Sequence, residues 1–134
     1  MFTFVAENID NFESHLSNPI TAPEFLDSVS SLSNNKAASF DQITNEILKS
    51  AKLIIAGPTH KLFNAILENS IYPSQWKMDI LSPIHKAGDK GDPNNYRGVT
   101  VSSCFGKLFN KILQKRLEKW CEEKNLISFG SVPE

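Results

Sequence analysis

Two short apolar runs around a polar loop constrain the fold of this chain more than any other feature. The runs are ILSPIH, which ends at His85, and GVTVSS, which begins at Gly98, and the loop between them contains AGDKGDPNN. Gly, Pro, Asp and Asn favour tight turns, because they adopt backbone angles or make local side-chain hydrogen bonds that other residues do not. The pattern predicts an antiparallel β-hairpin with an irregular tip, in which Asp89 and Asp92 bind the backbone of their own turns.

One cation stands at each end of this loop. Lys86 lies on the incoming side and Arg97 on the outgoing side, so that a hairpin brings the two together. An ammonium group is a point charge, whereas a guanidinium group is a planar fork that matches two phosphate oxygens. One interpretation is a site for a polyphosphate, and the other is a pair of solvated surface cations.

The rest of the chain is predicted to be mainly helical. Thr21, Pro23 and Glu24 form a helix start signal, in which the threonine caps the helix and the glutamate reaches back. Further helical patterns follow from Asn45 and from His60, with a break expected at Gly57-Pro58 or a new helix starting there. A long helix is expected after Ser102 or Ser103, and it ends near Lys124. The fold class is therefore α+β, mainly helical, with one antiparallel hairpin.

A row of lysines follows the outer face of the last predicted helix. Lys107, Lys111 and Lys115 are each four residues apart, and Lys119 continues the series. Such a row is able to track the backbone of a nucleic acid, with an affinity that falls as salt rises. The alternative is an ordinary solvated face, since charged stripes are common on amphipathic helices.

The charge of the chain is unevenly distributed. The 134 residues carry a formal net charge of −1. Residues 1–48 hold one basic and seven acidic side chains, whereas residues 49–134 hold thirteen basic and eight acidic ones, which is compatible with a polyanionic partner. Residues 1–19 are interpreted as an acidic tail or linker, with one helical turn around Phe12 and Leu16.

Cellular location is bounded only coarsely by the sequence. No apolar run is long enough to span a bilayer, and the acidic N-terminus is not a signal peptide, so no membrane partner is expected. Cys104 and Cys121 lack metal-ligand spacing and are interpreted as free thiols in a reducing compartment. An intracellular location follows, cytoplasmic or nuclear.

Several short elements in order resemble one protein family. The run PIHKAGDKGDPNNYRGVTVSSCFGKLFNKIL is similar to the fingers region of reverse transcriptases from non-LTR (LINE-type) retrotransposons, with P-I-x-K-x-G-D followed by N-Y-R. Upstream, KAASFDQITNEIL resembles a second family signature. Ser39 and Gln42 stand where that signature usually has glycine, so turn angles that glycine permits would be strained here. Asp41 matches the signature, and we interpret it as a helix cap.

The resemblance carries specific implications for function. It implies that residues 20–134 form the fingers part of a reverse transcriptase domain, an RNA-directed DNA polymerase. Arg97 would hold the triphosphate of the incoming nucleotide, and Lys86 would assist. The implied partners are an RNA template, a DNA primer, a deoxynucleoside triphosphate and the remaining palm domain. The palm aspartates bind two Mg²⁺ ions in this family. No such motif occurs here, so we expect no catalytic residue and no metal site in this chain.

A second reading belongs to another class of protein. A catalytically dead remnant would act as an RNA-binding module, through the basic helix and the hairpin, or as a helical protein-interaction module with exposed apolar surface. RNA binding that weakens when Lys107 and Lys111 become Glu, while Arg97→Ala hardly matters, would favour the RNA-binding form. Concentration-dependent oligomerisation without salt-sensitive RNA affinity would favour the protein-binding form.

The missing palm motif leads to a prediction about activity. The 134-residue chain alone is expected to show no templated nucleotide incorporation, because positioning groups without the metal-binding aspartates cannot activate the primer hydroxyl. A primer-extension assay on the purified chain checks this, and template-dependent extension would contradict it.

Overall fold

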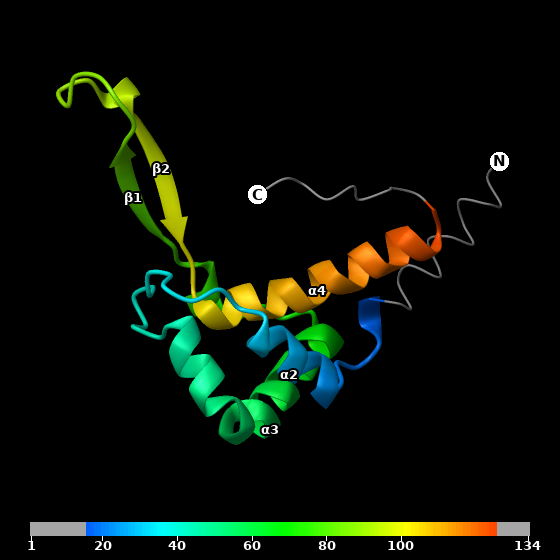
Figure 1. The fold of residues 1–134 in the computed structure, drawn as a ribbon. Coiled ribbons are helices and arrows are strands. Elements are labelled where there is room, and N and C mark those ends of the chain that lie inside the picture. Colours follow the sequence, from blue (N-terminus) through cyan, green and yellow to red (C-terminus); the bar gives the residue numbers. More distant parts are fainter. Residues whose placement is uncertain (1–15, 126–134) are drawn as a thin grey trace.

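The computed structural model describes residues 16–125. A long helix, α4 (Cys104–Glu123), lies across two others, α2 (Ala22–Ser30) and α3 (Asn45–Asn69), and a hairpin extends from the start of α4 (Figure 1). The hairpin strands are β1 (Ile80–His85) and β2 (Tyr96–Val101), with short 3₁₀ turns at Ser74–Lys77 and Pro93–Asn95. The combination of helices with one antiparallel two-stranded sheet agrees with the predicted α+β class.

Helix α2 begins as its sequence predicts. The Thr21 hydroxyl accepts a hydrogen bond from the Glu24 amide at 3.4 Å, and the Glu24 carboxylate accepts one from the Thr21 amide at 3.2 Å. This reciprocal pair satisfies two amide groups that the first turn leaves without partners. The helix then buries Phe25 and Val29, which are four residues apart and lie on one face.

Helix α3 corrects the prediction of a break at Gly57-Pro58. The helix runs without interruption from Asn45 to Asn69, with Pro58 inside it. Proline has no amide hydrogen to donate, and its ring crowds the carbonyl group four residues earlier, so it usually bends a helix. Figure 1 shows the two halves of α3 pointing in different directions. The proline therefore redirects this helix instead of ending it.

The core is centred on aromatic rings from four elements. The ring of Phe63 in α3 is fully buried and lies edge-on to three other rings, with centroid distances of 6.0 Å to Phe25, 5.9 Å to Trp76 and 5.2 Å to Phe109. Aromatic pairs favour this geometry because the positive ring edge meets the negative ring face. Trp76 is thus a core residue that joins the 3₁₀ turn before the hairpin to the helices.

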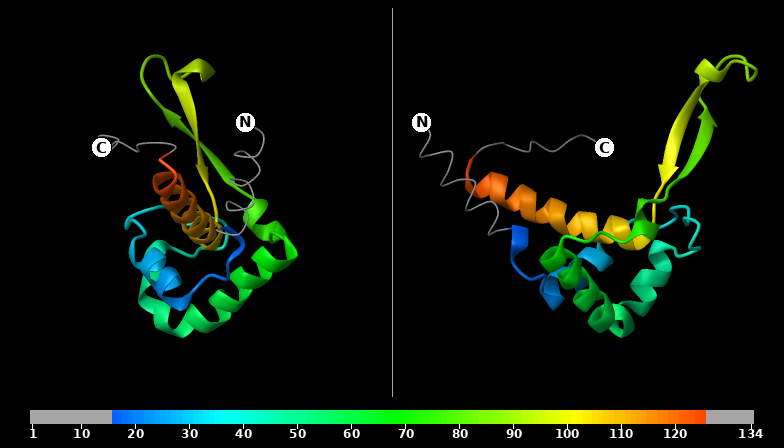
Figure 2. Two further views of the ribbon diagram at one scale, coloured as in Figure 1. Left: turned by 90° about the vertical axis from the view of Figure 1, so that its right-hand side faces the viewer. Right: turned by 180° about the vertical axis from the view of Figure 1, so that it is seen from behind.

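The hairpin has a regular register and few contacts with the helical body. Ile80 pairs with Val101, Pro83 with Gly98 and His85 with Tyr96. Both strands are largely exposed, and the hairpin points away from the helices in all views (Figure 2). An isolated two-stranded hairpin is only marginally stable. Because neither face of this hairpin is covered, its orientation depends on contacts at the ends of its strands.

The segment before α3 corrects the predicted role of Asp41. The N-cap of α3 is Thr44, whose hydroxyl accepts a hydrogen bond from the Ile47 amide at 3.3 Å. Asp41 lies three residues earlier, and its carboxylate accepts from the Ile43 amide at 3.1 Å. The cap prediction for Asp41 is wrong, because a second good capping residue lies closer to the first helical turn. Gln42 has a φ of 57°, the left-handed conformation that glycine adopts without strain.

Three further interpretations from the sequence concern a membrane span, the acidic tail and the two cysteines. Within residues 16–125, no helix has the length and apolar character that crossing a membrane requires. The acidic tail interpreted at residues 1–19 lies outside the described residues, apart from residues 16–19, as does Phe12. Cys104 and Cys121 are both free and buried, in agreement with the interpretation of free thiols.

The left-handed conformation of Gln42 predicts a stabilising substitution. Gln42→Gly is expected to raise the free energy of unfolding by about 0.5 kcal/mol, and Tm by about 2 °C, because glycine lacks the Cβ that crowds the carbonyl oxygen at this positive φ. This gain is net of the lost hydrogen bond from Gln42 Nε2 to the Ser39 carbonyl oxygen at 3.4 Å. Urea titration and thermal melting measure both quantities. Asn35→Gly is the matched control: Asn35 also has a φ of 57°, but asparagine tolerates this region and should gain less. Equal gains, or a loss for Gln42→Gly, would contradict the explanation.

Candidate functional site: a cationic hairpin and a lysine-lined pocket

The base of the hairpin is attached to the segment that precedes α3. The Ser39 hydroxyl donates a hydrogen bond to the Val101 carbonyl oxygen at 3.3 Å, and the Ser103 hydroxyl donates to the Asp41 carboxylate at 3.0 Å. These bonds link residues 62 positions apart and fix the end of β2 and the first turn of α4. Asp41 therefore links the segment before α3 to the N-cap residue of α4.

The hairpin tip is held by its own side chains. Asp89 accepts a hydrogen bond from the Gly91 amide, and Asp92 accepts one from the Asn94 amide, both at 2.9 Å. Asn95 donates from Nδ2 to the Asp89 carbonyl oxygen at 2.8 Å. The prediction that both aspartates bind their own turns is confirmed, and the loop has a defined shape.

Lys86 and Arg97 lie on the same face of the hairpin. Arg97 pairs with Ile84, and directly after the last pair of the register the Lys86 amide donates to the Asn95 carbonyl oxygen at 2.7 Å. Side chains two residues apart on a strand share a face, so Lys86 and Ile84 lie on the side that carries Arg97. Lys86 and Arg97 are then diagonal neighbours across the two strands. Both are exposed, and within residues 16–125 neither forms an ion pair.

The opposite face of the hairpin carries an aromatic pair. The rings of His85 and Tyr96 lie edge-on with centroids 5.3 Å apart, and the Tyr96 hydroxyl donates to the Lys90 carbonyl oxygen at 2.9 Å. These contacts tie the loop to the strands from the side away from the cations. The two faces are therefore chemically distinct, one cationic and one aromatic.

The lysine row on α4 is divided by its contacts with α2. Lys115 forms an ion pair with Asp27 at 2.5 Å, and Lys111 donates to the Ser31 carbonyl oxygen at 2.7 Å. The hydrogen bond and the charge of Lys115 lower the pKa of Asp27. Lys107 and Lys111 instead share a pocket, so the three lysines do not form one uniform outward stripe.

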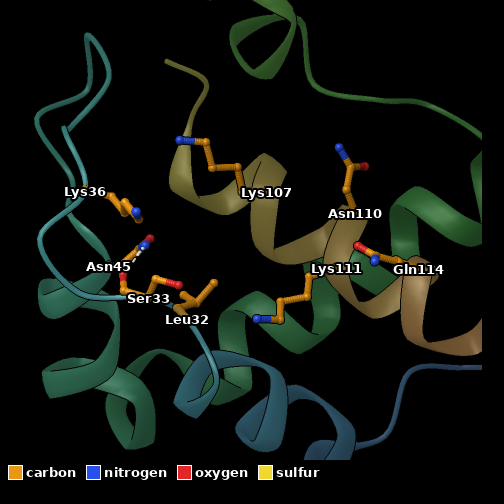
Figure 3. Close-up of a pocket in the computed structure, with 8 residues that line it drawn as sticks. All are labelled: Leu32, Ser33, Lys36, Asn45, Lys107, Asn110, Lys111 and Gln114. Carbon is orange, nitrogen blue, oxygen red and sulfur yellow. Dashed lines mark hydrogen bonds between the residues drawn. The ribbon is translucent and has the colours of Figure 1, made fainter. Parts of the chain in front are cut away.

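That pocket lies between the start of α4, the start of α3 and the loop after α2. Its volume is about 570 Å³ (Figure 3). Eight residues line it, and three of them are lysines: Lys36, Lys107 and Lys111, with Leu32, Ser33, Asn45, Asn110 and Gln114. No carboxylate is among these residues, so the pocket is suited to an anion.

Arg116 has a structural role that the sequence reasoning missed. Its side chain is buried, and its guanidinium donates to both oxygens of Glu24, at 2.6 Å and 2.8 Å. It also donates to the carbonyl oxygens of Leu16, Asn18 and Pro19. The available signal was spacing: Arg116 lies four residues after the buried Ile112, on the inner face of the helix and not on the lysine row.

The described residues offer no alternative chemistry based on thiols or metals. Burial raises the pKa of the Cys104 thiol, and its sulfur donates to the Ile43 carbonyl oxygen at 3.1 Å, which does not favour a thiolate nucleophile. Within residues 16–125, no group of three or more His, Cys, Asp or Glu side chains is placed to hold a metal ion. These residues do not fit the two-metal site of a polymerase.

Comparison with known proteins identifies relatives of the chain. No protein-family model matches it. It is 28% identical over 127 residues to a probable RNA-directed DNA polymerase from transposon BS, and 33% identical over 95 residues to one from transposon X-element, both of Drosophila melanogaster. These alignments cover 90% and 70% of this chain. A putative 115 kDa protein in the type-1 retrotransposable element R1DM of the same species is 26% identical over 76% of the chain.

These matches confirm the family resemblance seen in the sequence. The chain is related to the RNA-directed DNA polymerases of non-LTR retrotransposons. It spans only 14%, 10% and 10% of the length of the three relatives.

The contacts of Arg116 lead to a prediction about stability. Arg116→Met should lower the free energy of unfolding by about 3 to 5 kcal/mol, because it removes two hydrogen bonds from the Glu24 carboxylate, which keeps the one from the Thr21 amide, and one from each of three backbone carbonyl groups. Urea denaturation followed by circular dichroism measures the loss. Lys115→Met is the matched control, since its ion pair with Asp27 is largely exposed and should matter much less. Similar losses in the two variants would contradict the role assigned to Arg116.

Proposed function

We propose that this chain forms part of the fingers of an RNA-directed DNA polymerase and contacts the incoming nucleoside triphosphate and the template. The observation that carries the proposal is the position of Lys86 and Arg97 on one exposed face of the projecting hairpin. The relationship to retrotransposon polymerases supplies the class of reaction. The geometry of the two cations supplies the place where this chain would contribute to it.

In this proposal the two cations neutralise the triphosphate. The Arg97 guanidinium donates two parallel hydrogen bonds to oxygens of one phosphate, and the Lys86 ammonium provides a point charge to a neighbouring one. Positioning and charge neutralisation are the main contributions that a protein makes to phosphoryl transfer. The RNA template, the DNA primer and the palm domain are the further partners in the complete enzyme. There the aspartates of the palm domain would bind Mg²⁺.

The lysines of α4 extend the proposal to the nucleic acid. Lys107, Lys111 and Lys115 were predicted as a row that tracks a nucleic-acid backbone, and Lys107 lies in the first turn of α4, directly after the hairpin. Lys115 is the least available of the three, because Asp27 already accepts from its ammonium. A nucleic acid that contacts Lys115 has to compete with that ion pair.

The hairpin proposal predicts a triphosphate-dependent response. Deoxythymidine triphosphate added to ¹⁵N-labelled chain should shift the amide signals of residues 84–98, with a dissociation constant of about 1 mM for an exposed site of two charges. Deoxythymidine monophosphate should bind about tenfold more weakly, because it offers fewer phosphate oxygens. Arg97→Ala should abolish the difference between the two nucleotides.

Two control variants make the test specific. Lys90→Ala removes another exposed cation of the same loop and should leave the preference for triphosphate unchanged. Arg97→Lys keeps the charge without the planar fork and should give an intermediate result. Shifts that fall outside the hairpin, or an equal response of the Arg97→Ala and Lys90→Ala variants, would rule the proposal out.

A further inference from the structure

The lysine-lined pocket is a second cationic site, away from the exposed hairpin face. Lys36 comes from the loop after α2, and Lys107 and Lys111 come from the first two turns of α4 (Figure 3). Like charges that share a pocket repel one another, and none of the eight lining residues is acidic. An anion in the pocket would reduce this repulsion.

Glu46, an acidic residue next to the pocket, binds the loop that carries Lys36. Glu46 follows the lining residue Asn45, and its Oε1 accepts a hydrogen bond from the Asn35 amide at 2.5 Å. That hydrogen bond lowers the pKa of Glu46. Glu46 therefore holds the loop that carries Lys36, while Asp27 is near enough to Lys111 for the lysine charge to lower the pKa of its carboxyl group.

The walls of the pocket are fixed before any ligand arrives. Asn45 donates from Nδ2 to the Ser33 carbonyl oxygen at 2.8 Å, and Lys49 donates to Asn34 Oδ1 at 2.6 Å, so the loop is attached to the first turns of α3. Lys111 donates to the Ser31 carbonyl oxygen, which anchors its ammonium while leaving two N–H groups. Pre-ordered donors lose less conformational entropy on binding.

The lining residues also indicate which part of a ligand the pocket would contact. The amide groups of Asn110 and Gln114 also line the pocket, although Gln114 Nε2 already donates to Glu118 Oε1 at 2.7 Å and the Asn110 side chain is hydrogen-bonded to Tyr72. No aromatic side chain is among the eight residues, so the pocket cannot stack on a base. Its volume of about 570 Å³ is larger than one phosphate group requires. Lysine charges and amide donors without a stacking surface suit the backbone of a strand and not its bases.

From these observations we propose that the pocket formed by Lys36, Lys107 and Lys111 binds the phosphodiester backbone of a nucleic-acid strand, without regard to base or sugar. The proposal refines the nucleic-acid role suggested above by adding Lys36 and leaving out Lys115, and it rests on that role. It does not depend on nucleotide binding by the hairpin. A strand held here would lie next to the start of α4, where β2 ends.

The test uses the 134-residue chain and labelled 12-nucleotide strands. Fluorescence anisotropy should show that Lys36→Gln and Lys107→Gln each weaken binding of oligouridylate about threefold to tenfold at low salt. Each variant should also reduce the slope of log affinity against log salt by about 0.7, the value for one lost phosphate contact of a single strand. Lys61→Gln is the matched control, because Lys61 is an exposed lysine of α3 outside the pocket and should change neither quantity.

Further ligands separate the sources of the phosphate. Oligodeoxythymidylate should bind within about threefold of oligouridylate, since backbone contacts do not read the sugar. A preference above about tenfold for RNA would overturn the backbone assignment. Inorganic pyrophosphate that competes as well as the 12-mer at equal phosphate concentration would show a small-anion site and overturn the strand assignment.

The test of strand binding by the pocket and the test of triphosphate binding by the hairpin can fail independently. Triphosphate-induced shifts at residues 84–98 should persist in Lys36→Gln and Lys107→Gln, and strand binding should persist in Arg97→Ala. Loss of strand binding in Lys61→Gln to the same extent as in the pocket variants would show that only overall charge matters. Circular dichroism confirms that the compared variants are folded.

Discussion

The packing of the Phe63 ring against Phe25, Trp76 and Phe109 is the contact on which the other parts of the structure depend. It joins α2, α3, α4 and the turn that leads into β1 in one cluster. A ring of this size buries enough apolar surface to contribute about 2 to 3 kcal/mol, and its edge-on contacts add to that. Because the turn at Trp76 is part of the cluster, the direction in which β1 leaves the helices is set by the core.

Polar contacts complete what the apolar core cannot fix. The bonds from Ser39 to Val101 and from Ser103 to Asp41 hold the end of β2 and the start of α4, although neither face of the hairpin is covered. Arg116 has a comparable role in the second half of α4. Its guanidinium donates hydrogen bonds to backbone carbonyl oxygens of the segment before α2. A buried guanidinium requires nearly all of its donors to be used, which makes the position of the chain around it specific.

The two cationic sites follow from these attachments. The hairpin presents Lys86 and Arg97 away from the helices, whereas Lys36, Lys107 and Lys111 converge where α3, α4 and a loop meet. Both would suit phosphate groups, but one is an exposed pair on a strand face and the other a pre-ordered pocket. The relationship to RNA-directed DNA polymerases leads us to propose that the two sites contact different parts of a bound nucleotide and nucleic acid.

Local sequence patterns determined the hairpin, the capping box of α2, the aspartate turns at the tip and the family relationship, because each depends on residues close together in the chain. The same patterns failed at Pro58, which lies inside a continuous α3, and at Asp41, which accepts from Ser103 instead of capping α3. Only the tertiary structure decided that Arg116 is buried and that Lys115 forms an ion pair with Asp27 of α2. It also decided that Lys36 lines the same pocket as Lys107 and Lys111. These outcomes depend on contacts between residues 70 or more positions apart, which periodicity within one helix cannot report.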